Sequence, residues 1–155
     1  LRLYVMFVAP PEKEIEWTGL SGRKCAGRVD VVGGTFITDF KTTRIAKPEW
    51  FQGEALRRKY HAQLAWYLDG LGGPQKDAMI VAVESSPPFA VSVFKLTPRA
   101  LDEGRKQYHG WMEKLLQCEA ANVWPGYCQS IVDLDVPEEL EMQFESDEEE
   151  SEDAA

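Results

Sequence analysis

The sequence is poor in the residues that build disulfide scaffolds, structural zinc sites and membrane spans. Its three cysteines, Cys25, Cys118 and Cys128, cannot all pair and show no C-x-x-C spacing, which argues against a disulfide framework or a zinc site. No apolar run approaches the length of a bilayer span, and no charged segment with a cleavage site opens the chain. Repeats, glycine-rich phosphate loops and nucleophile triads are also missing. What remains is 155 residues with 44% hydrophobic content, which predicts one compact cytoplasmic domain with a real core.

The net charge of −9 is concentrated near the end of the chain. Segment 138–153, EELEMQFESDEEESED, holds 10 of the 26 acidic residues and no basic residue. Without it, 17 basic residues stand against 16 acidic ones. We therefore predict a domain over residues 1–137 and a disordered acidic tail over 138–155, whose small apolar content cannot offset chain entropy. A DNA mimic and a docking segment for a partner are the alternatives for this tail.

A predicted hairpin carries the first candidate site. In GRVDVVGGTFITDFKTT, residues 27–43, the pair Gly33-Gly34 separates strands predicted at 27–32 and 35–42 and predicts a tight turn with positive φ. A turn centred on the two glycines would set Arg28 opposite Asp39 and Asp30 opposite Ile37. Because side chains alternate, one face would be polar and the other would be core. The polar face would carry Arg28, Asp30, Val32, Thr35, Ile37, Asp39 and Lys41, and the core face Val29, Val31, Phe36, Thr38 and Phe40.

Two acids converge on the polar face of this hairpin. Asp30 and Asp39 would be diagonal neighbours with Cβ atoms within about 7 Å, close enough to bind one cation. Paired carboxylates repel and are costly to desolvate unless a cation neutralises them, so the pattern indicates a hard-metal site, with magnesium the natural ion. Lys41 would stand beside them. The alternative is a solvent-facing hairpin whose charges only keep a sheet edge soluble.

A second candidate lies on a predicted helix. In KYHAQLAWYLDGLGG, residues 59–73, Tyr60, Gln63, Leu64 and Tyr67 fall on one helical face, and glycines mark the helix end. Gln63 needs a polar partner, which a carboxylate-metal cluster would supply. An ordinary amphipathic helix with an exposed glutamine is the alternative.

The remaining segments predict a mixed sheet flanked by helices, an α/β fold. Residues 14–20, 78–84 and 89–96 read as strands, the last two joined by the turn SSPP, and residues 97–121 read as a helix beginning at Thr97-Pro98. Residues 48–71 predict one helix, or two helices broken near Gly53. Glu84 ends a strand, where it would either approach the site or simply mark the strand end. Between residues 41 and 59, six bases oppose two acids, which suits a phosphate backbone or a solvated helix face.

These motifs together resemble the PD-(D/E)XK, or restriction-endonuclease-like, nuclease superfamily, and more narrowly its phage-type exodeoxyribonuclease VIII (RecE-type) branch. The matching elements are Gly27 and Asp30 in GRVD, Asp39 and Lys41 in DFKTT, Gln63 and Tyr67 in YHAQLAWY, and more loosely VESSPPF and a cysteine followed by WPGY. The similarity covers roughly residues 15–137. The family has a helix before the first strand that contributes an acid or histidine, and the chain looks like a fragment that lacks it.

The resemblance implies a Mg²⁺-dependent deoxyribonuclease, with Mn²⁺ able to replace Mg²⁺ and no iron–sulfur cluster, since the four grouped cysteines of related cluster-bearing nucleases are missing. Asp30, Asp39 and the carbonyl of Phe40 would bind the metal. Lys41 would orient a water or stabilise phosphoryl charge, and Gln63 and Tyr67 would position these groups. The expected DNA-binding residues are Arg28, Thr42, Thr43, Arg44, Lys47, Arg57, Arg58, Lys59, Tyr60 and His61.

The same resemblance implies 5′ to 3′ action at double-stranded DNA ends, leaving 3′ single strands for a phage-type annealing recombinase, by a homo-oligomer with no membrane association, in a bacterial or phage-infected cell. Two alternatives stay open. A structure-specific or restriction-type endonuclease would share every site residue, because a fold and metal site do not fix substrate geometry. A catalytically degenerate nuclease fold serving as an interaction domain is the other.

Overall fold

The computed structural model describes residues 11–74, 76–128 and 130–135. The elements in chain order are β1 (Pro11–Thr18), a short 3-10 turn η2 (Leu20–Gly22), β2 (Lys24–Val32), β3 (Phe36–Thr43), α1 (Pro48–Arg57), α2 (Tyr60–Leu71), β4 (Asp77–Glu84), β5 (Val91–Lys95) and α3 (Pro98–Ala121). The chain divides into two compact units, residues 1–117 and 118–155. The predicted boundary at residue 137 and the acidic tail 138–155 lie outside the described residues. No helix in the described ranges combines the length and apolar character of a membrane span.

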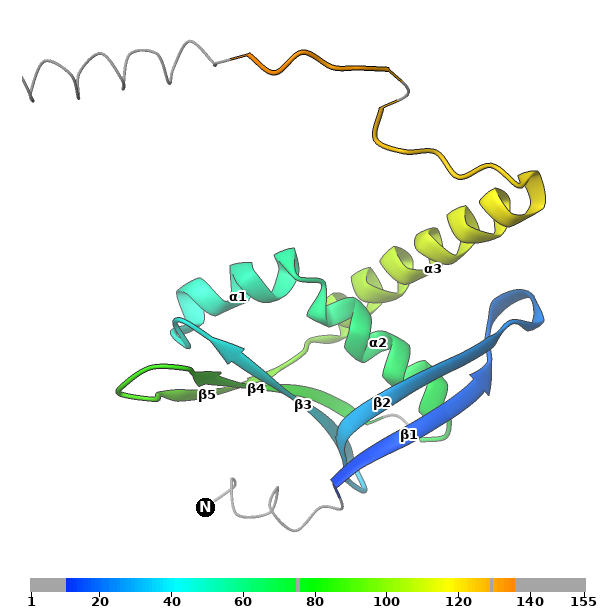
Figure 1. Cartoon of the computed structure of the whole chain (residues 1–155). Helices are drawn as coiled ribbons and strands as arrows, with labels where there is room; N and C mark the ends of the chain where they lie inside the picture. The colour runs from blue at the N-terminus through cyan, green and yellow to red at the C-terminus, as the bar shows by residue number, and fades with distance from the viewer. Residues whose placement is uncertain (1–10, 75, 129, 136–155) are drawn as a thin grey trace, which may run out of the picture. The chain divides into compact units, whose positions relative to one another are not determined.

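The five strands form one mixed sheet in the order β1-β2-β3-β4-β5. Strands β3 and β4 are parallel, and the other neighbours are antiparallel. Parallel neighbours need a crossover, which α1 and α2 supply, and both helices lie on the same side of the sheet (Figure 1). The predicted α/β class with a mixed sheet is confirmed.

The hairpin between β2 and β3 has a different register from the predicted one. Val31 pairs with Thr38 and Val32 with Ile37, and the N–H of Gly33 donates to the carbonyl of Phe36 at 2.8 Å. The turn is therefore centred on Gly34-Thr35, one residue later than predicted, and neither glycine has positive φ. A Cβ at Gly33 would lie 2.7 Å from the Phe36 ring, so the glycine serves this close approach.

The predicted core face of the hairpin is partly wrong. Val29, Val31 and Thr38 are buried as predicted, but Phe40 is 47% exposed, and Ile37 from the predicted polar face is fully buried. The reason is that β3 is a central strand whose Ile37 face lies under the crossover helices, where Ile37 joins the same core cluster as Leu64 of α2.

The segment predicted as one or two helices forms two, but the break is not at Gly53. It falls at Arg58-Lys59, where Lys59 adopts the left-handed conformation with φ 63°. The N–H of Arg58 closes α1 by donating to Glu54 O at 2.8 Å, and the carbonyl of Lys59 accepts from Ala62 N at 3.0 Å to open α2. A helix tolerates an interior glycine at about 1 kcal/mol, so Gly53 does not end α1.

An aromatic cluster fixes α2 over β1 and β2. The rings of Trp17 and Trp66 meet edge to face at 4.7 Å, and Trp66 meets Tyr108 of α3 at 5.2 Å. The indole N–H of Trp66 donates to the carbonyl of Ala26 at 3.3 Å. A Cβ at Gly104 would overlap the backbone of His61, so this glycine permits α3 to approach α2 closely. These contacts set the position of the next turn of α2, which carries Gln63.

Thr97 and Glu84 both make hydrogen bonds to backbone N–H groups at the ends of elements. Thr97 caps α3, since its Oγ1 accepts the N–H of Ala100 at 3.2 Å. Glu84 has a structural role, because its carboxylate accepts the N–H groups of Ala46 at 2.9 Å and Ala90 at 3.3 Å.

Candidate active site

The candidate site begins where β2 and β3 separate. Their register consists of the two pairs nearest the turn, and Figure 1 shows the strands spreading apart beyond it. There the carboxylate of Asp30 accepts the N–H of Phe40 at 2.7 Å. The side chain thus satisfies a backbone donor that a regular ladder would have paired with backbone. Asp30 is held at the opening by the backbone of the strand that carries Asp39.

Asp39 and Lys41 form a buried ion pair on β3. Lys41 Nζ lies 2.6 Å from Asp39 Oδ2, and the two side chains are 19% and 3% exposed. The ammonium also lies 4.6 Å from the centre of the Tyr60 ring, a cation–π contact from the first turn of α2. Lys41 is therefore fixed by a charge on its own strand and by an aromatic face on the helix above.

Gln63 connects this pair to α2. Its Oε1 accepts from Lys41 Nζ at 3.0 Å, while its Nε2 donates to Asp39 Oδ1 at 3.4 Å and to Tyr67 Oη at 2.8 Å. A carboxamide can accept from a cation and donate to an anion at once, which neither glutamate nor lysine can do when charged. Tyr67 in turn packs over β2, where a Cβ at Gly27 would stand 2.9 Å from its ring.

The pKa of Asp39 indicates that the site holds too little positive charge to offset the burial of its carboxylate. Burial raises the pKa of Asp39 above its ordinary value; Lys41 opposes this shift by hydrogen bonding and by its charge, and the charge of Asp30 adds to it. One lysine therefore does not fully compensate for the desolvated carboxylate and its acidic neighbour.

The donor set suits a small, hard divalent cation. Asp30 and Asp39 offer carboxylate oxygens, and Phe40 between the site residues of β3 offers its carbonyl. Mg²⁺ is commonly bound by one or two carboxylates while it keeps several waters or substrate oxygens, so two acids are sufficient. No group of three or more His, Cys, Asp or Glu side chains comes together within the described ranges. Within the described ranges, the residues suit a divalent cation that keeps open coordination positions and do not form a closed structural site.

Most of the expected DNA-binding residues lie on or near α1. Thr42, Arg44, Arg57 and Arg58 line a groove of about 960 Å³ beside α1, with Trp50 and Gly53. We call it the α1 groove. Lys47 and Lys59 are exposed at the ends of α1. Tyr60 contacts Lys41, as described above.

Three of those residues are not placed as predicted. The pairing of Arg28 with Asp39 is wrong, because β2 pairs with β3 only at Val31 and Val32 in a later register, and Arg28 instead forms an ion pair with Glu12 of β1 at 3.5 Å. Thr43 is buried, and its hydroxyl donates to Glu54 at 2.8 Å. His61 is buried beside Phe51 and Phe94, and burial lowers its pKa. Alternation and helical periodicity give the face of a residue but not which partner covers that face.

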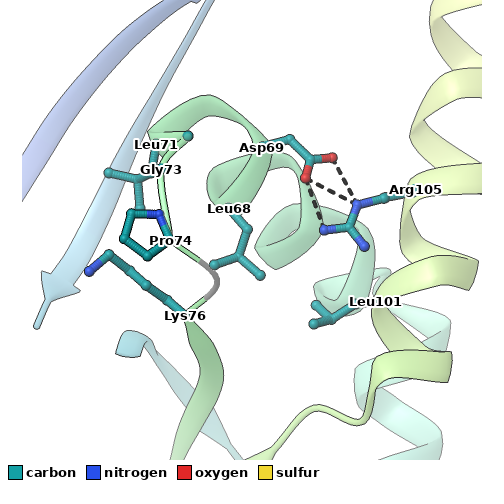
Figure 2. Close-up of a pocket in the computed structure, with 9 residues that line it drawn as sticks. Leu68, Asp69, Leu71, Gly73, Pro74, Lys76, Leu101 and Arg105 are labelled. Carbon is teal, nitrogen blue, oxygen red and sulfur yellow. Dashed lines mark hydrogen bonds and ion pairs between the residues drawn. The ribbon is translucent and has the colours of Figure 1, made fainter. Parts of the chain in front are cut away.

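A second cavity, of about 510 Å³, lies between α2 and α3 and contains none of the site residues (Figure 2). Its charges are already paired. Arg105 holds the carboxylate of Asp69 with bonds of 3.0 and 3.1 Å, and Tyr108 donates its hydroxyl to the same carboxylate. Lys76 donates to the carbonyls of Gly33 and Gly34. The paired charges around this cavity connect α2 to α3 and the chain after α2 to the hairpin turn.

With this geometry in view, the chain matches the family model of a PDDEXK-like domain of unknown function (DUF3799) over residues 4–134. The chain belongs to this family. The PD-(D/E)XK assignment made from the motifs is thus confirmed at the superfamily level, while the RecE-type branch stays a prediction.

One solved structure supports the fold. The structure resembles that of a "Putative exonuclease" from Eubacterium rectale with a TM-score of 0.70 at 15% sequence identity, over 88% of this chain and 57% of that one. The structure of SSO0001 is less similar, with a TM-score of 0.43 at 18% identity over 68% of this chain and 51% of that one. The chain thus spans little more than half the length of each.

Among curated proteins, a leucine–tRNA ligase of Gloeobacter violaceus is 33% identical over 72 residues. These residues are 46% of this chain and 8% of the ligase. So short a share of that protein says nothing about the activity of this one.

Proposed function

We propose that this chain is a metal-dependent deoxyribonuclease that hydrolyses phosphodiester bonds at the separation of β2 and β3. The observation that supports it is the contact set around Asp39. A buried carboxylate has a lysine at 2.6 Å and a glutamine that bridges the two, and a second acid is hydrogen-bonded to the backbone of the same strand. A surface hairpin kept soluble by its charges has no need to bury an aspartate under a helix.

Asp30 and Asp39 are the residues we assign to Mg²⁺, together with the carbonyl of Phe40, and Mn²⁺ is expected to replace it. Bound there, the cation would polarise the scissile phosphate and lower the pKa of a water. Binding is favoured by the raised pKa of Asp39, because an added cation relieves the same charge deficit that now favours a proton.

Lys41 is the residue we assign to the reacting phosphate. Its ammonium donates to Gln63 at 3.0 Å and is ion-paired with Asp39 at 2.6 Å, and we assign its remaining donor capacity to a phosphoryl oxygen or the attacking water. A cation whose direction is already fixed loses little freedom when the substrate arrives. Gln63 is a positioning residue, because it holds Lys41 and Asp39 at once, and Tyr67 holds the other end of the amide.

For the substrate we propose ends of double-stranded DNA, degraded 5′ to 3′ by a homo-oligomer to leave 3′ single strands for an annealing recombinase. This rests on the resemblance to RecE-type enzymes. Linear and covalently closed circular duplexes of equal sequence distinguish it from an endonuclease. End-dependent loss of label supports the proposal, and equal cutting of the circle favours the endonuclease.

The test of the chemistry compares Lys41→Ala with Lys95→Ala on an end-labelled duplex, with Mg²⁺, Mn²⁺ or EDTA. Lys95 is a matched control, because it is an exposed lysine of the same sheet, paired to Asp77 at 2.7 Å. We expect Lys41→Ala to abolish cleavage, Asp39→Asn to lose both cleavage and metal affinity, Gln63→Ala to fall between them, and Lys95→Ala to keep activity. Cleavage by folded Lys41→Ala would refute the catalytic assignment. Duplex binding without cleavage by the wild type would favour a degenerate, interaction-only domain.

A further inference from the structure

The α1 groove lies beside the end of β3 that follows the candidate site. Thr43, which lines it, comes two residues after Lys41 and therefore projects from the same face of the strand. The opposite wall is α1, which presents Trp50, Gly53 and Arg57 at positions i, i+3 and i+7 of one helical face. A chain that passes over Lys41 toward the end of β3 would therefore meet this face next.

Trp50 offers an accessible aromatic surface inside the groove. The residue is 66% exposed, although it lies on a helix whose neighbouring Phe51 is buried in the core. A single exposed indole needs no explanation by itself. Its place in a groove with arginines, one helical turn from a glycine, indicates a binding surface.

Gly53 is not required by packing. A Cβ built on it would meet nothing within 4 Å, and its φ is not positive. Glycine in a helix interior lowers stability relative to alanine, so the fold itself would be served better by another residue. What the glycine does provide is open space beside Trp50, in the wall of the groove.

The charges of the groove favour an anion. Glu54 is occupied, since it accepts from Thr43 at 2.8 Å and from Arg58 at 2.7 Å. Neither Arg44 nor Arg57 forms an ion pair with another residue in the described part of the chain, and Glu49 is the remaining acid of the lining. Two arginines are thus left to bind phosphates.

We propose that the α1 groove binds a single strand of DNA, with a base stacked on Trp50 in the space left by Gly53 and with Arg44 and Arg57 on the adjacent phosphates. The inference rests on the proposed function, because it places the strand that leads to or from Lys41. A single strand fits better than a duplex, since only an unpaired base can present its face to an indole. Indole stacking with backbone charges gives binding with little sequence preference.

The experiment measures binding of a fluorescein-labelled oligo(dT) by anisotropy in EDTA, so that no cleavage contributes. We expect Trp50→Ala to weaken binding by about 10-fold, within the range for loss of one stacked base, and Trp50→Phe to keep most of the affinity. Trp111→Ala is the matched control, because Trp111 is 51% exposed on α3, outside the groove, and should bind like the wild type.

Gly53→Gln provides an independent arm. A helix-favouring side chain should raise the thermal midpoint of unfolding while it weakens oligo(dT) binding, a combination that general damage to the fold cannot produce. Unchanged binding by Trp50→Ala, equal loss in Trp111→Ala, or Gly53→Gln that binds like the wild type would overturn the inference. Trp50-dependent binding by a protein with no nuclease activity would leave the groove assignment standing and refute the proposed function alone.

Discussion

Removal of the Lys41 ammonium gives the sharpest test of how the site is held together. In Lys41→Met the carboxylate of Asp39 would stay buried, with its side chain 3% exposed, and would lose the cation at 2.6 Å. At an effective dielectric constant of about 20, the Coulomb attraction at this separation is about 6 kcal/mol, and the desolvation of the two ions offsets part of it. Breaking a buried pair from one side typically costs 3 to 5 kcal/mol. We expect the free energy of unfolding to fall by about 3 kcal/mol at pH 7.

The double variant Lys41→Met, Asp39→Asn separates the pair from the packing. With both charges gone, no ion is left without compensation, so the loss should be much smaller than in Lys41→Met alone, with a coupling free energy of at least about 2 kcal/mol. Urea unfolding monitored by circular dichroism, without divalent metal, measures each corner of the cycle. Strictly additive losses, or a loss below about 1 kcal/mol in Lys41→Met, would refute the buried ion pair as described.

The stability lost in Lys41→Met should also depend on pH, in a direction that the pKa of Asp39 predicts. The pKa of Asp39 is raised in the folded protein, and removing Lys41 takes away the largest effect that lowers it. A carboxyl with a raised folded pKa binds more protons in the native state than in the unfolded state, so stability falls as pH rises through that interval. The deficit of Lys41→Met should therefore shrink on acidification from pH 7 toward the ordinary aspartate pKa. A deficit that grows on acidification over that range would contradict the assignment.

Three further predictions follow from single contacts. Saturating Mg²⁺ at about 100 times its dissociation constant should stabilise the wild type by about 2.7 kcal/mol in thermal unfolding, and Asp30→Asn should lose most of this shift. Gly27→Ala should destabilise by about 1 to 3 kcal/mol, because the added Cβ would lie 2.9 Å from the Tyr67 ring, and urea unfolding would show it. Thr97→Ala should cost about 1 kcal/mol through loss of its bond to the N–H of Ala100, measured the same way, and an unchanged midpoint would refute that cap.

Much of the fold could be predicted because the local signals were strong. Alternating strands, the Thr97-Pro98 helix start and the SSPP turn each fix an element through its own residues. The hairpin register could not be predicted, since two adjacent glycines allow turns centred on either neighbouring bond. What decided it was the Phe36 ring lying against Gly33, a packing contact with no sequence signature.

The grouping of Asp39, Lys41 and Gln63 could be predicted from the sequence, but their contacts could not. Spacing placed Asp39 and Lys41 on one face of a strand, and the polar Gln63 on a helix pointed to a partner. The direct bond from Gln63 to Lys41, and the Tyr60 ring beneath the ammonium, depend on how α2 crosses β3, which long-range packing of Trp17 and Trp66 determines. Burial of Thr43 and His61 has the same origin, because polar residues carry no local sign of the element that will cover them.

The separation of β2 from β3 leaves the sheet as two hydrogen-bonded parts. One part is β1 with β2 and the other is β3 with β4 and β5. The two parts are joined by two residue pairs beside the turn. Asp30 belongs to the first part and Asp39 to the second, so the hydrogen bond from Phe40 N–H to Asp30 connects the two parts. A cation bound by both carboxylates would link the two parts of the sheet. The flexing of this sheet about the two residue pairs should therefore decrease when metal binds, and amide hydrogen exchange at Phe40 would slow.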